Sequence, residues 1–382
     1  MAALIVTGSL VVWNSGGQER VTSGDGGGPT TAVEAIVPAT PDVTAPASTT
    51  ALPAVVSAWA AIPPNPRGTV SGATVVWTGT EAVSVGGDVN NGVAPGVTAY
   101  SPVTGQWRDV AGDVPLLSPI VVWTGNEVLA VGWTATGRPR TVAAALSLDT
   151  GEWTILADAP APDKLWSSDA WAWSGTELLV LSGNHGMETA TAQAFNPATG
   201  EWRMLTPAPL GPRYSAASVW TGTEWLIWGG DDDATNFADG VAYDPLTDTY
   251  RPLAASPLSA RVVRGVWTGT EMVLLAGTSA GGNAESDGAA YNPITDTWRL
   301  TAPGFGHPGF VPVWTGSVII QFAKGGAVWY DPATDEWSSG DMTFGDVPHE
   351  DRSPVWTGSH VVLLGSYDAT TGGATFTPRL PS

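Results

Sequence analysis

The chain has 382 residues, a formal net charge of −21 at pH 7, only two lysines and no cysteine. The lack of cysteine excludes disulfides and thiolate metal sites. The acidic balance argues against binding to nucleic acid and to anionic lipid surfaces, because like charges repel. The length suits one large domain with additional segments.

The first stretch in chain order, residues 2–13, is apolar but too short to span a bilayer by itself. It resembles the hydrophobic part of an export signal, although no Lys or Arg precedes it. An alternative is a decayed repeat, because residues 11–16 echo the turn motif described below. We interpret residues 1–13 as an export signal or anchor remnant, which predicts an extracytoplasmic protein, either secreted or tethered to a membrane.

Residues 14–52 are rich in Gly, Thr, Pro and Ala and contain few bulky apolar side chains. Such a stretch cannot bury enough apolar surface to fold, so we expect a flexible linker.

A Trp-(Thr/Ser)-Gly turn then recurs along the rest of the chain. The spacings are 46, 50, 47, 47, 47 and 42 residues, and a fixed period in this range indicates a repeat architecture. We expect most of the tryptophans to pack between repeats. The seven turns begin at Trp77, Trp123, Trp173, Trp220, Trp267, Trp314 and Trp356.

Each unit contains signals for four short strands. An apolar run follows the turn and tends to end in glycine, as in residues 226–230. After a variable polar loop, the unit ends on two aromatic positions separated by six residues, such as Tyr100 and Trp107. An Asn/Asp-Pro-x-Thr-Gly/Asp hairpin lies between them in most copies. Strands that are apolar on both faces indicate sheets covered on both sides. Seven such units predict an all-β, seven-bladed β-propeller of four-stranded blades.

The double glycine Gly86-Gly87, followed by Tyr100 and Trp107, resembles the Kelch repeat, the type found in the central domain of galactose oxidase. The resemblance covers about residues 53–382. It implies a propeller but not one function, because Kelch propellers serve many roles. The copper–radical chemistry of galactose oxidase needs a cysteine, which this chain lacks.

The two ends of the repeat region complement each other. The seventh unit lacks an outer strand, whereas Trp59 lies 18 residues before Trp77, at the spacing of a closing aromatic. We therefore expect residues of about 53–60 to complete the last blade and close the ring, so that the propeller comprises residues 53–382.

Polar residues gather near the position seven residues before each turn tryptophan, where we expect the innermost strand to begin on the face with variable loops. Guanidinium groups there would suit an anion or a sugar carboxylate. The alternative is that these groups pair with acidic neighbours or with backbone carbonyls between blades. The predicted ligand-binding residues are Arg213, His307, His349, Trp166, Arg261, Arg352 and His185.

No catalytic motif of the Gly-x-Ser-x-Gly, phosphate-loop or His-Glu-x-x-His kind is present. We predict no catalytic residue, cofactor or metal. Residues 231–233 with Asn236 and Asp239 offer oxygen atoms for Ca²⁺, but they lack the spacing of a calcium loop, and a solvated acidic loop is favoured.

These observations favour a monomeric, non-catalytic module that binds a protein or a glycan on its variable face. The alternative function is an enzyme acting on acidic sugars, such as a lyase, epimerase or mutarotase, with a rim His as acid or base and an Arg holding the carboxylate.

Overall fold

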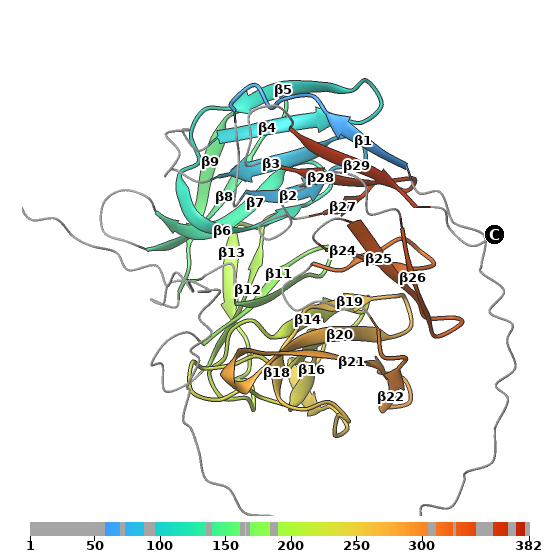
Figure 1. The fold of residues 1–382 in the computed structure, drawn as a ribbon. Coiled ribbons are helices and arrows are strands. Elements are labelled where there is room, and N and C mark those ends of the chain that lie inside the picture. The colour runs from blue at the N-terminus through green and yellow to red at the C-terminus, as the bar shows by residue number, and fades with distance from the viewer. Residues whose placement is uncertain are drawn as a thin grey trace, which may run out of the picture. The chain divides into compact units, whose positions relative to one another are not determined.

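The computed structural model contains seven antiparallel sheets in its described part; six consist of successive strands, and the seventh combines the first strand with the last three (Figure 1). The described residues are 58–68, 73–87, 96–134, 140–160, 165, 169–183, 190–304, 311–323, 326–340, 354–365 and 372–378. All of them belong to the unit Pro53–Ser382.

The first three blades follow one another along the chain. Blade 1 contains β2 (Thr74–Trp77), β3 (Ala82–Gly86), β4 (Gly96–Ser101) and β5 (Gln106–Ala111). Blade 2 contains β6 (Leu116–Trp123), β7 (Val128–Thr134), β8 (Thr141–Leu146) and β9 (Trp153–Asp158). Blade 3 contains β10 (Ala170–Trp173), β11 (Leu178–Ser182), β12 (Thr191–Asn196) and β13 (Glu201–Met204).

The next three blades repeat the pattern. Blade 4 contains β14 (Ala217–Trp220), β15 (Trp225–Trp228), β16 (Gly240–Asp244) and β17 (Thr249–Pro252). In blade 5 the innermost strand is divided into β18 (Arg261–Val262) and β19 (Gly265–Trp267), which both pair with β20 (Met272–Ser279). A 3₁₀ turn (Ala280–Gly282), β21 (Asn283–Asn292) and β22 (Thr297–Thr301) complete it. Blade 6 contains β23 (Val313–Trp314), β24 (Ile319–Ala323), β25 (Gly326–Asp331) and β26 (Glu336–Ser339).

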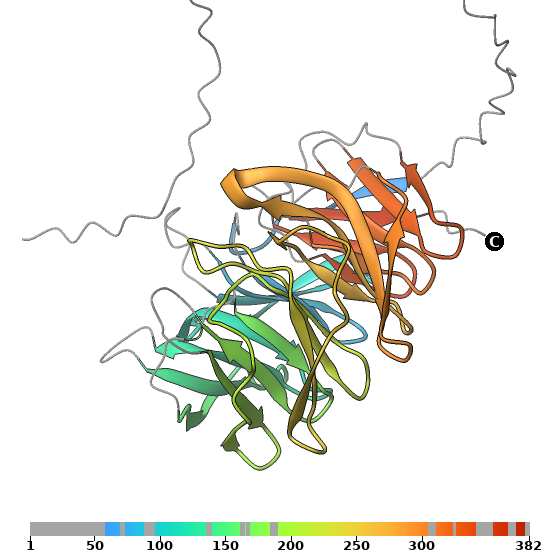
Figure 2. The same cartoon turned by 90° about the horizontal axis from the view of Figure 1, so that it is seen from below.

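The last blade joins the two ends of the propeller. Its strands are β27 (Val355–Trp356), β28 (Val361–Leu364), β29 (Gly373–Thr377) and, as the outer strand, β1 (Ala58–Ile62). Trp59 pairs with Phe376, and in both views the blue strand β1 lies among the red strands of this blade (Figures 1 and 2). The predicted closure is confirmed, with the strand reaching Ile62 rather than residue 60; residues 53–57 lie outside the described part.

The two kinds of turn follow from their sequences. In the first, Gly79 has a φ of +98°, and the Thr78 hydroxyl accepts a hydrogen bond from the Glu81 N–H at 3.0 Å. In the second, the residue before the outer strand adopts the left-handed conformation, which glycine tolerates best. Gly105 fills it in blade 1, with a φ of +67°, but Asp248 fills it in blade 4, with a φ of +52°.

The core lies between the blades. In β15, Trp225 and Ile227 pack toward blade 3, whereas Leu226 and Trp228 pack toward blade 5. Both faces of the sheet are thus buried, as the continuous apolar runs predict. The turn tryptophan of each blade packs against one of these clusters, which confirms the expected packing role. The one helical element among the described residues is the short 3₁₀ turn of blade 5, and no described helix has the length and apolar character needed to cross a membrane.

Candidate functional site

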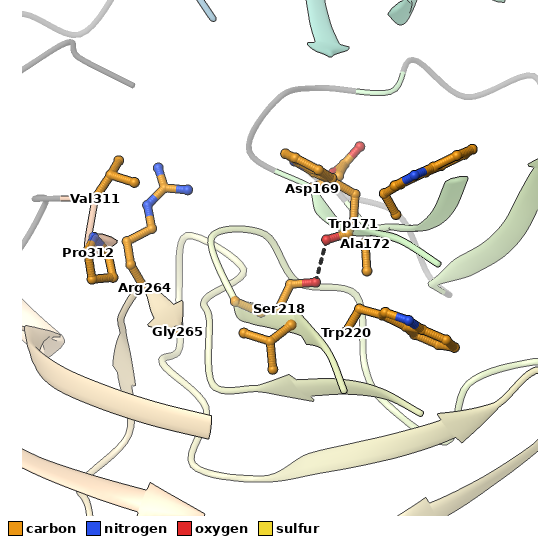
Figure 3. Close-up of a pocket in the computed structure, with 12 residues that line it drawn as sticks. Asp169, Trp171, Ala172, Ser218, Trp220, Arg264, Gly265, Val311 and Pro312 are labelled. Carbon is orange, nitrogen blue, oxygen red and sulfur yellow. Dashed lines mark hydrogen bonds between the residues drawn. The ribbon is translucent and has the colours of Figure 1, made fainter. Parts of the chain in front are cut away.

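A cavity of about 340 Å³ lies against the innermost strands of blades 3 to 6 (Figure 3). Its walls come from β10, β14 and β19, from the residue directly before each of these strands, and from the two residues before β23. One side carries Asp169 and Trp171, the other carries Arg264 with Val311 and Pro312. The cavity therefore brings together side chains from four different repeats.

Arg264 gives this cavity an unpaired positive charge. Its side chain is open to solvent, but the surrounding protein desolvates the guanidinium and lowers the pKa of Arg264. Within the described part of the chain, it makes no hydrogen bond and no ion pair. Every other described arginine is paired with a carboxylate: these are Arg67, Arg108, Arg140, Arg203, Arg213, Arg251, Arg261 and Arg299.

Asp169 supplies a negative charge to the opposite wall. It lies directly before β10 in blade 3, and only 4% of its surface is exposed. Asp169 also interacts with another group of the protein. Blade 4 lies between Asp169 and Arg264 along the ring, so the cavity separates two opposite charges.

Aromatic side chains form another part of the cavity wall. Trp171, Trp173 and Trp220 are half-buried and line the cavity. Ser218 holds this wall in place: its hydroxyl donates to the Trp171 carbonyl and accepts from Trp225 Nε1, both at 2.7 Å. Figure 3 shows the first of these bonds crossing from blade 4 to blade 3. Because the Ser218 hydroxyl already donates its hydrogen to the Trp171 carbonyl, Ser218 holds the wall in position.

Arg213, predicted to bind ligand, is only 1% exposed. Its guanidinium donates to Asp239 at 2.7 Å and to the Gly229 carbonyl at 3.3 Å, and it lies 4.1 Å from the centre of the Phe237 ring. A further bond reaches the Gly211 carbonyl at 3.1 Å. These contacts fasten the loop between β15 and β16, which matches the alternative of pairing with acidic neighbours and carbonyls.

Arg261 makes the same set of contacts one blade further on. It donates to Asp287 at 2.5 Å, to the Ala276 carbonyl at 3.3 Å and to the Ser259 carbonyl at 3.0 Å. The side chain is 1% exposed. Both arginines are thus engaged by their own blades, and a role for them in ligand binding stays a prediction.

The expected start of the innermost strand was wrong in most blades. The strands β10 and β14 begin three residues before the turn tryptophan, not seven. The preceding residues anchor loops instead, as Arg213 does. Among the strands of the described part, only β6 of blade 2 reaches back to the expected position, Leu116. The other predicted site residues lie outside the described part of the chain: Trp166, His185, His307, His349 and Arg352.

The acidic loop of blade 4 uses its oxygens within the protein. Asp232 Oδ1 accepts the N–H groups of Ala234 at 3.0 Å and Thr235 at 2.7 Å. Asp233 accepts from the Tyr214 hydroxyl, and Asp239 pairs with Arg213. Among the residues with described positions, no group of three or more His, Asp or Glu side chains is arranged to hold a metal.

Sequence reasoning missed Arg264, although a signal for it exists. Three residues before the turn tryptophan, blade 5 alone carries a charge. The other blades have uncharged residues there: Thr74, Ile120, Ala170, Ala217, Val311 and Ser353. Counting from the observed strand start, rather than seven residues back, singles out this arginine.

The fold and the cavity define a β-propeller repeat protein with a charged, tryptophan-lined pocket at its inner strands. No model of a known protein family matches the sequence. A search of curated proteins likewise gives no relative.

Proposed function

We propose that the protein is a Kelch-like, non-catalytic binding module that holds an anionic group of its ligand in the cavity beside Arg264. The single observation that carries this proposal is the unpaired guanidinium in a chain whose other described arginines are all neutralised. The Arg264 guanidinium has no counter-ion among the described residues, so an entering carboxylate can form a strong, bidentate interaction with it. Pockets of this size, within a range of about 300–1,000 Å³, are typical of small-molecule sites.

The ligand group would reach the cavity from the face where the blade-connecting segments enter. Asp169 lies directly before β10, and Arg264 lies directly before β19, between the two parts of the innermost strand of blade 5. A protein or glycan partner would present an acidic side chain or a sugar acid there. The apolar residues 1–13 and the linker-like residues 14–52 support an exported, extracytoplasmic module.

Isothermal titration of the full chain with small carboxylates, including uronic acids, tests the proposal. We expect saturable binding that Arg264→Gln reduces at least tenfold. The matched control is Arg140→Gln, which removes the same charge from an exposed ion pair with Asp158 outside the cavity. Equal binding by the wild type and Arg264→Gln would contradict the proposal, as would chemical turnover of the bound acid observed by NMR.

A further inference from the structure

We propose that the cavity beside Arg264 binds a small apolar monocarboxylate, a free acid with one carboxylate on a hydrocarbon ring or branched chain without hydroxyl groups. This inference rests on the proposed function, because it keeps the ligand carboxylate on the Arg264 guanidinium. It adds the chemical nature of the rest of the ligand and disfavours sugar acids. The volume of about 340 Å³ suits one such small molecule rather than a polymer.

The side chains next to Arg264 are apolar. Val311 and Pro312 lie directly before β23 and form the same side of the cavity as the guanidinium (Figure 3). Val311 is 36% exposed, so its hydrocarbon surface is accessible to a ligand. A ligand whose carboxylate pairs with Arg264 can therefore place an apolar body against Val311 and Pro312 without crossing the cavity. Covering this surface removes apolar area from water, which favours binding.

The tryptophans extend the apolar surface over another part of the wall. Trp171, Trp173 and Trp220 are half-buried, and each indole has one N–H donor and no acceptor. Aromatic faces bind hydrocarbon through dispersion and burial, without needing polar groups on the ligand. A sugar ring offers such walls only its two faces, because its hydroxyl groups project around the rim. The tryptophans therefore favour a body that is apolar on all sides.

Few groups in the wall could accept a hydrogen bond from a sugar hydroxyl. The Ser218 hydroxyl and the Trp171 carbonyl bond to each other, and the same hydroxyl accepts from Trp225 Nε1. Asp169 is only 4% exposed and already interacts with another group. The other described side chains that line the cavity have no acceptor. A sugar acid would thus give up hydrogen bonds to water that these side chains do not replace.

A pair of six-membered rings tests the role of the hydroxyl groups. Cyclohexanecarboxylate and glucuronate both carry one carboxylate on a ring, but only glucuronate carries hydroxyl groups. Isothermal titration of the full chain should show at least tenfold tighter binding of cyclohexanecarboxylate. Cyclohexylmethanol has the same hydrocarbon ring without the charge, and it should bind at least tenfold more weakly than cyclohexanecarboxylate.

Two matched variants test the apolar wall. Val311→Thr replaces one methyl group by a hydroxyl group and should weaken the binding of cyclohexanecarboxylate at least threefold. Val103→Thr makes the same change in the turn between β4 and β5, at a side chain that is 90% exposed and outside the cavity. This control should leave the affinity unchanged.

The outcomes separate this inference from the proposed function. If glucuronate binds through Arg264 as tightly as cyclohexanecarboxylate does, the apolar ligand is overturned while the anion site stands. Equal affinities of the Val311→Thr and Val103→Thr variants would also overturn it. If no carboxylate binds, or if cyclohexylmethanol binds as tightly as the acid, the proposed function fails as well. If Val311→Thr does not fold, the comparison of the three probes on the wild-type protein still decides the matter.

Discussion

Asp248 of blade 4 holds Thr206 of blade 3 through two hydrogen bonds. The Thr206 N–H donates to Oδ1 at 3.0 Å, and its hydroxyl donates to Oδ2 at 2.9 Å. Asp248 sits in the left-handed turn before β17, where blades 1 to 3 have glycine. A backbone N–H of the preceding blade binds the equivalent aspartate in the next two blades: Ala254 binds Asp296 at 2.9 Å, and Ala302 binds Asp335 at 2.8 Å.

Each of these aspartates ends a chain of polar contacts between blades. Arg203 pairs with Glu177 in its own blade and donates to the Tyr243 hydroxyl of the next blade at 3.3 Å. Tyr243 in turn donates to Asp248 at 2.7 Å. Burial first, and then the bond to Asp248, raises the pKa of Tyr243 to about 12. The same chain recurs from Arg251 and Arg299, so it ties blades 3 to 6 together.

The first prediction concerns Asp296. Asp296→Ala removes the bonds from Tyr291 and Ala254 and leaves a β-carbon at a φ of +51°. The carboxylate is half exposed, so we expect the lost hydrogen bonds to cost about 2 kcal/mol in the free energy of unfolding. Asp296→Gly should lose about 1 kcal/mol less, because glycine accepts this conformation. Urea denaturation measures both; equal losses would refute the strain contribution.

The second prediction concerns acid stability. The Tyr291 hydroxyl and then the Ala254 N–H lower the pKa of Asp296. Burial raises the pKa of Asp248, but the bonds from Thr206 and Tyr243 outweigh it, so the pKa is also lowered. A depressed folded-state pKa stabilises the protein above the unfolded value of about 3.9, and this contribution disappears as the pH falls through the folded value.

Replacing these two aspartates and Asp335 by asparagine should therefore flatten the fall in stability below about pH 4 while lowering stability at pH 7. Urea midpoints between pH 7 and pH 3 would show this. A triple variant whose midpoint falls as steeply as that of the wild type would show that other carboxylates control acid unfolding.

The third prediction concerns ring closure. Trp59 packs against Phe376 at 4.7 Å and Phe322 at 5.7 Å between ring centroids. Trp59→Ala should cost about 3 kcal/mol, at the low end for a tryptophan because the side chain is half-buried. Deleting residues 1–62 removes the whole strand and should lower the thermal midpoint further. Deleting residues 1–52 is the control and should leave the midpoint unchanged; a large effect of that deletion would argue against a linker.

The fourth prediction compares the contributions of Arg213 and Arg264 to the stability of the fold. Arg213→Met removes the donor to Gly229 and Gly211 carbonyls and the partner of Asp239, so we expect a loss of about 2–3 kcal/mol. Arg264→Met removes no described bond and should change stability by less than about 0.5 kcal/mol. Urea unfolding of both variants checks this. Equal losses would mean that Arg264 also has a structural role.

Much of the fold could be predicted because the same sequence pattern recurs in seven repeats. Trp59 could be assigned to the last blade because that blade lacked an outer strand and because closing aromatics lie 16 to 20 residues before the next turn tryptophan. The exact limits of the strands could not be predicted, because the residues before each innermost strand follow no repeated sequence pattern.

The site was harder to predict, since its contacts cross from blade to blade. Arg213 pairs with Asp239 only because the loop between β15 and β16 folds back, and no local sequence pattern indicates this contact. Arg213 and Arg261 are 48 residues apart, whereas the turn tryptophans of their blades are 47 apart. That single extra residue hides their equivalence. Arg264 was missed for another reason, because the comparison was made seven rather than three residues before the turn tryptophan.

The pairing of β1 with β29 also determines when the propeller can close during synthesis. Ala60 and Thr375 meet across 315 positions of sequence, so β1 emerges early from the ribosome and waits for almost the whole chain. Until then, the outer strand of the last blade has no partner and Trp59 has no aromatic neighbour from that blade. Long-range pairing of this kind is slow and leaves apolar surface exposed. Newly made molecules are therefore prone to aggregation until the strands that pair with β1 have been synthesised.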